Sequence, residues 1–89
     1  MTEITYGDGK GDSVKTAISI SGARTGPEGV RAEYLHIAEK LGERGKDWEL
    51  DMQRLIRKED RRYDRIDVKL ADGTKTLFHF EITEFFGKH

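Results

Sequence analysis

The chain has 89 residues, a formal net charge of −1, and 37% charged residues. This length predicts one domain over residues 1–89, and the balanced charge provides no overall field to attract nucleic acid or an acidic membrane. The absence of cysteine excludes disulfides and thiolate chemistry, and no apolar run reaches the roughly 18 residues of a membrane span. We therefore expect a soluble, cytoplasmic protein that does not bind a membrane, and the alternative is a secreted protein without cysteines.

The N-terminal part predicts two strands, at residues 2–6 and 13–21, joined by the glycine-rich loop 7–12. Ile18 and Ile20 share one face of the second strand, as expected where one side of a strand is buried. The pattern therefore predicts a β-hairpin with a long turn.

The next segment has the signals of an amphipathic helix. Thr25, followed three residues later by Glu28, is typical of a capping box, and Pro27 suits the first helical turn. An apolar stripe at helical spacing follows and ends before Gly42, which predicts a C-cap there. The stripe comprises Val30, Tyr34, Ile37, Ala38 and Leu41.

The approach to this helix is also a candidate anion site. Glycines allow close backbone approach, and a helix N-terminus carries partial positive charge. Arg24 and Gly26 are the candidate anion-binding residues. The segment lacks the ending of a phosphate-binding loop and the spacing of a dinucleotide fingerprint, so a capped helix start is the alternative interpretation. No cofactor is expected.

Residues 47–56 fit two patterns. Trp48, Leu50 and Met52 alternate with polar residues as in a strand, whereas the segment also contains an apolar stripe at helical spacing. A strand is favoured because the next alternating segment needs a neighbour and because a helix would leave Leu50 exposed. We therefore expect a strand.

The last third of the chain alternates between apolar and polar residues on both sides of a turn. The apolar sets are Ile66, Val68 and Leu70, then Phe78, Phe80 and Ile82. Period two predicts an antiparallel hairpin with one buried face. A three-residue turn at residues 72–74 would pair Val68 with Phe78 and Ile66 with Phe80. The whole chain is then an α+β fold, with one amphipathic helix on an antiparallel sheet in the order ββαβββ.

The outer face of this hairpin carries candidate catalytic residues. The expected register places Asp67 opposite His79 and Arg65 opposite Glu81. Asp67-Val68-Lys69 has the acid-x-lysine form that metal-dependent nucleases and phosphodiesterases use to hold Mg²⁺ and to stabilise developing charge. The alternative is a solvated strand face with complementary charges, and the histidines form no zinc pattern. The candidate residues are Asp67, Lys69, His79 and Glu81.

A basic cluster surrounds the turn between the two preceding strands, and Tyr63 offers an aromatic ring for stacking on a base. Such a cluster is a candidate nucleic-acid site, although a charged hairpin tip that keeps a sheet edge soluble has the same composition. The candidate residues are Arg57, Lys58, Arg61, Arg62 and Arg65.

Phe85 and Phe86 follow the last strand and are candidate interface residues. Two adjacent rings in an extended segment cannot face the same core, so one of them is expected to be exposed unless the tail turns. No specific catalytic motif accompanies them. The leading hypothesis is a small non-catalytic protein-interaction module whose partner is another protein or a second copy, bound through the terminal strand or these two aromatics.

Overall fold

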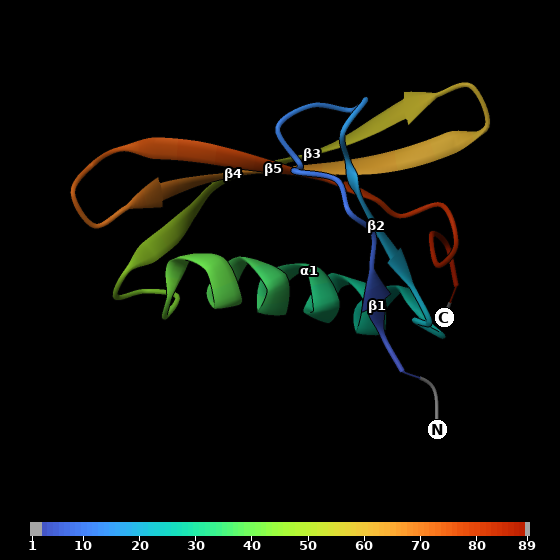
Figure 1. Cartoon of the computed structure of the whole chain (residues 1–89), viewed down its shortest axis with the longest axis horizontal. Coiled ribbons are helices and arrows are strands. Elements are labelled where there is room, and N and C mark those ends of the chain that lie inside the picture. The colour runs from blue at the N-terminus through green and yellow to red at the C-terminus, as the bar shows by residue number, and fades with distance from the viewer. Residues whose placement is uncertain (1–2, 89) are drawn as a thin grey trace.

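The computed structural model describes residues 3–88, which form one helix on one face of a five-stranded sheet (Figure 1). The α+β class and the order ββαβββ are confirmed. In chain order the elements are β1 (Thr5–Tyr6), β2 (Ile18–Ser21), α1 (Gly26–Leu41), β3 (Trp48–Lys58), β4 (Arg61–Leu70) and β5 (Lys75–Glu81).

The sheet is mixed, which corrects the expectation of a wholly antiparallel one. The strand order is β1-β2-β5-β4-β3, and β2 runs parallel to β5 while the other neighbours are antiparallel. Helix α1 carries the chain back beneath the sheet, so that β3 starts in the same direction as β2 (Figure 1). Two hairpins then reverse the chain twice, and β5 therefore runs the same way as β2.

Helix α1 begins and ends as the sequence predicts. The Thr25 side chain accepts a hydrogen bond from the Glu28 backbone N–H at 3.2 Å, which satisfies one of the amides that every helix start leaves open. At the other end Gly42 has a φ of 107° and donates its N–H to the Ala38 carbonyl at 2.8 Å. These caps fix the helix between two glycine-bearing turns.

The N-terminal hairpin forms with shorter strands than predicted, and residue 2 of the first one lies outside the described residues. Strand β2 begins only at Ile18 because Ser13 and Thr16 bond to each other's backbone and side chain, which makes a local turn in place of a strand. The loop between β1 and β2 folds over the face of the sheet opposite α1 (Figure 1).

The core lies between the sheet and α1. The apolar sets predicted to face inward are largely buried, with Ile66, Val68 and Phe80 at 0% exposure. Trp48 is also a core residue: it is 1% exposed, and its indole Nε1 donates to the Gly42 carbonyl at 2.9 Å. Its ring stacks on Tyr34 with centroids 6.4 Å apart, so the first residue of β3 is tied to the end of α1.

The predicted faces of the β4–β5 hairpin are correct, but the predicted register is wrong by two residues. Ile66 pairs with Phe78, and Arg65 rather than Asp67 lies opposite His79. Leu70 donates its N–H to the Thr74 carbonyl at 2.7 Å, so the three-residue loop comprises residues 71–73, one position earlier than expected. The reason is Gly73, whose φ of 89° places it in the left-handed position that ends such a loop.

Candidate interaction site

Strand β3 forms an open edge of the sheet, and the strand predicted at residues 47–56 is confirmed. It is the longest strand, with 11 residues, and β4 is its only neighbouring strand in the described sheet. An isolated bridge joins its first residue, Trp48, to Arg44, so the edge is open from Glu49 onward. A register shift between Leu50 and Met52 places a bulge at Asp51. Beyond the bulge, Gln53, Leu55 and Arg57 share the helix-facing side with the β4 residues opposite them. The unpaired backbone of such an edge is a template for another strand.

An apolar groove of about 240 Å³ lies beside the second half of β3. It runs between the start of α1, the β3 edge and the segment after β5. Leu55 is 43% exposed at its rim and Phe86 is 42% exposed at its end. Its walls include Val30, Leu55, Ile82, Phe85 and Phe86, and its polar lining includes Gln53 and Asp64.

A buried acidic pair lies where the groove meets the core. Glu33 of α1 is 0% exposed and Asp64 of β4 is 5% exposed. Gln53 donates its amide N–H to Asp64 Oδ2 at 2.8 Å and accepts a hydrogen bond from the Tyr34 hydroxyl at 2.8 Å. Neither carboxyl oxygen of Glu33 has a hydrogen-bond partner within residues 3–88. Within the described residues, no ion pair to a cation is formed by either acid.

Burial is the main cause that raises the pKa of Glu33 to about 10, and the Asp64 carboxyl acts in the same direction. Burial also raises the pKa of Tyr34, with Glu33 and Asp64 adding to it and Arg44 opposing it. Glu33 is therefore a neutral acid at neutral pH, so its burial does not require an ion of opposite charge in the isolated chain.

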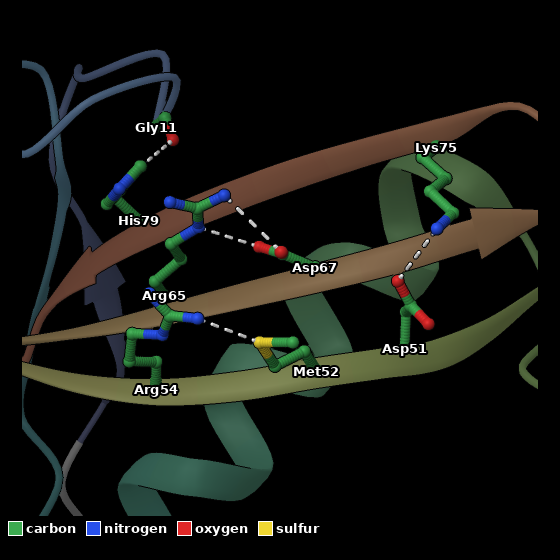
Figure 2. A network of polar contacts seen from close by, with 8 residues as sticks. All are labelled: Gly11, Asp51, Met52, Arg54, Arg65, Asp67, Lys75 and His79. Carbon is green, nitrogen blue, oxygen red and sulfur yellow. Dashed lines mark hydrogen bonds and ion pairs between the residues drawn. The ribbon is translucent and has the colours of Figure 1, made fainter.

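The candidate catalytic residues lie on the outer face, and Figure 2 shows two of them, Asp67 and His79, with their polar contacts. Arg65 donates to both carboxylate oxygens of Asp67, with Nε 2.8 Å from Oδ1. His79 is covered by the N-terminal loop, since its ring Nδ1 and its backbone N–H both lie within hydrogen-bond distance of the Gly11 carbonyl oxygen. Glu81 pairs with Arg61 at 3.3 Å.

The four residues do not converge on one point. Asp67 lies opposite Leu77, four positions along the sheet from Glu81, which corresponds to about 14 Å. Lys69 is exposed near the turn, opposite Lys75. No cluster of three or more acidic or histidine side chains suited to a metal ion exists in the described part of the chain. The nuclease hypothesis therefore has no assembled metal site behind it.

The candidate anion residues lie at the start of α1, where the chain itself occupies the backbone donors. Gly26 donates its N–H to the Lys88 carbonyl at 2.7 Å, and the Glu28 N–H is bonded to the Thr25 hydroxyl. Arg24 is exposed next to them. The C-terminal segment and the cap thus occupy donors that an anion would need.

The candidate nucleic-acid residues spread over both faces of the β3–β4 hairpin. Arg57 pairs with Arg62 and Lys58 with Arg61, around a tight turn in which Glu59 has a φ of 57°. Arg61 binds Glu81, whereas the Arg62 guanidinium lies 5.7 Å from the centre of the Phe86 ring. Arg65 is engaged with Asp67 further along the strand. The cluster is thus divided between two faces and partly neutralised.

The two C-terminal aromatics have opposite environments. Phe85 is 2% exposed and packs so closely on α1 that a Cβ added to Gly29 would lie 2.2 Å from its ring. Phe86 remains accessible at the end of the groove. Only Phe86 is therefore placed to contact a partner.

Sequence reasoning missed Glu33, Asp64, Gln53 and the β3 edge. A signal existed for both acids. Glu33 lies four residues before Ile37 on the buried side of α1, and Asp64 has the parity of Ile66 in β4. An acid on an apolar stripe indicates a buried polar group that needs a partner.

Comparison with family models, with curated proteins and with solved structures finds no match for this chain. Within the described residues, no helix is long and apolar enough to cross a membrane. The geometry of the chain is therefore the basis for a functional proposal.

Proposed function

We propose that this chain is a small, non-catalytic, cytoplasmic protein-interaction module that binds a second copy of itself through β3. The observation that supports this is the 11-residue open edge with exposed Leu50, Met52 and Leu55. An edge of this length and apolar content either pairs with another strand or is protected from doing so. A second copy, related by a twofold axis, presents the same strand in antiparallel orientation.

The terminal strand is a poor alternative for this pairing. Strand β5 lies between β4 and β2, so both of its sides are paired. Before the start of β2, the Gly11 carbonyl accepts the hydrogen bond of the His79 N–H in place of a strand residue. Phe86 remains part of the proposed contact because the groove in which it lies runs beside β3. We therefore place the proposed interface on β3 rather than on the terminal strand β5, and of the two C-terminal aromatics only Phe86 belongs to it.

Pairing two β3 edges would extend each sheet into one continuous sheet and cover Leu55 on both sides of the axis. A chain of 89 residues buries little surface by itself, so the added burial stabilises it. The proposal therefore explains why a small domain carries a long edge strand with exposed apolar side chains among its charges.

The test is absolute mass by light scattering coupled to size exclusion over a wide concentration range. We expect the mass of two 10.2 kDa chains for the wild type. Leu55→Lys would place like charges near the twofold axis and weaken association by about tenfold to a hundredfold. The matched control is Leu35→Lys, because Leu35 is 57% exposed on α1 away from β3.

A wild type that stays monomeric at every concentration would overturn the proposal. Equal effects of Leu55→Lys and Leu35→Lys would also overturn it, since a general loss of solubility or fold would then explain both. Circular dichroism of each variant shows whether the fold is retained.

A further inference from the structure

The buried acidic pair lacks a cation, and β3 is the element that separates it from solvent at the sheet edge. Within the described residues, neither Glu33 oxygen meets the geometry of a hydrogen bond, although the Asp64 carboxyl is close enough to raise the Glu33 pKa. Asp64 accepts a hydrogen bond from the Gln53 amide and faces no cation within those residues. The nearby Arg62 is directed elsewhere, with its guanidinium over the Phe86 ring and bonded to the Arg61 carbonyl. A guanidinium from outside the chain would complete this site.

The bulge and the charges of β3 restrict how two copies can pair. Side chains on opposite strands must share a face, which limits the twofold axis to a position beside a residue of the regular segment 52–58. An axis at Arg54, Arg57 or Lys58 opposes two identical cations, and an axis at Ile56 opposes Arg54 and Lys58. An axis at Met52 or Gln53 would bring the bulged Asp51 into the ladder. Pairing centred on Leu55 avoids each of these conflicts.

We infer, on the basis of the proposed self-association, that β3 pairs about Leu55 and that Arg57 of the partner subunit enters the groove to bind the carboxyl groups of Asp64 and Glu33. In this register the partner's Arg57 lies opposite Gln53 on the helix-facing side. Twofold symmetry produces the same contact twice.

The distances allow this contact. A strand added beyond β3 lies about 4.8 Å from β3 and about 10 Å from β4. Asp64 is two residues along the strand from the position opposite the partner's Arg57, so their Cα atoms are about 12 Å apart, a span that the two extended side chains cover. The Arg57 side chain is exposed and makes no hydrogen bond or ion pair within residues 3–88, so it is free to engage a second copy. The planar guanidinium matches carboxylates in a bidentate manner, and the apolar groove walls exclude water from the pair.

The experiment measures the dissociation constant of the dimer by sedimentation equilibrium for Arg57→Gln and for Lys58→Gln. Lys58 is the matched control because it is adjacent, carries the same charge and faces the outer side. We expect Arg57→Gln to weaken the dimer about tenfold to a hundredfold and Lys58→Gln to change it less than about threefold. The conservative Arg57→Lys should restore part of the affinity.

A second pair of measurements identifies the contact itself. In an Asp64→Asn background, Arg57→Gln should lose most of its effect, because the charge that it binds is gone. If the Asp64→Asn protein does not fold, Glu33→Gln is the second background: it removes the other carboxyl group assigned to the partner's Arg57 and should reduce the effect of Arg57→Gln in part.

The outcomes separate the two proposals. A monomeric wild type overturns the proposed function and this inference together. A dimer that Leu55→Lys disrupts, but in which Arg57→Gln behaves like Lys58→Gln, leaves the β3 pairing in place and overturns the arginine contact. An unchanged effect of Arg57→Gln in the Asp64→Asn background has the same meaning.

Discussion

Charged side chains on the two faces of the sheet differ in whether they have partners of opposite charge. On the outer face Arg65 binds Asp67, and the Asp51 carboxylate lies 3.6 Å from the Lys75 amine (Figure 2). Arg61 binds Glu81 on the same face. On the helix-facing side Glu33 and Asp64 lie together, and neither forms an ion pair with a cation from residues 3–88. Exposed charges with nearby partners contribute little to either stability or binding. The unbalanced acids beside the groove therefore indicate more about interaction than the larger charged surface does.

The largest effect expected from this comparison follows Glu33→Gln. The folded-state pKa of about 10 lies above the ordinary 4.5, so between these values the folded protein holds a proton that the unfolded chain has released. The free energy of unfolding therefore falls as the pH rises through that window, by up to about 1.4 kcal/mol per pH unit. Glutamine keeps the shape without this penalty and should raise the free energy of unfolding at pH 7 by about 2–3 kcal/mol.

Urea unfolding at about pH 5, 7 and 9, at a protein concentration where the chain is monomeric, measures this effect. Glu39→Gln is the control, because Glu39 is exposed on the same helix. The gain from Glu33→Gln should grow with pH, whereas that of Glu39→Gln should not. Parallel pH profiles for wild type and Glu33→Gln would show that Glu33 is not buried as a neutral acid.

Local signals predicted much of the fold, whereas the site depends on contacts between distant elements. The Thr25 cap and the alternation around Ile66 are encoded within a few residues, and both are confirmed. Parallel pairing of β2 with β5 depends on how α1 crosses the sheet, which no local period specifies. The same crossing brings Glu33 to Asp64. The sequence shows each acid on the apolar side of its own element, but it does not show that the two acids lie next to each other.

A smaller effect is expected at the hydrogen bonds that orient the acidic pair. Tyr34→Phe removes the hydroxyl that donates to Gln53 Oε1, and the loss of one such bond costs about 1 kcal/mol. Tyr63→Phe is the control, because Tyr63 is buried and its hydroxyl has no hydrogen bond within residues 3–88. Urea unfolding should show a loss for Tyr34→Phe only. Equal losses of unfolding free energy in the two variants would show that removing any tyrosine hydroxyl has this cost. The hydrogen bond to Gln53 would then not be the cause.

The smallest effect is expected on the outer face, at Glu81→Gln. This change breaks the ion pair with Arg61, whose side chain is 60% exposed, so the cost should be about 0.2–1 kcal/mol and should disappear in about 1 M salt. Comparing urea unfolding at low and high salt with that of Glu33→Gln measures both faces on one scale. A salt-independent loss at Glu81 larger than the change at Glu33 would reverse the comparison, because the outer face would then contain the costly charge. The interface would have to be sought there, where β3 contributes Met52 and Arg54 rather than Leu55 and Arg57.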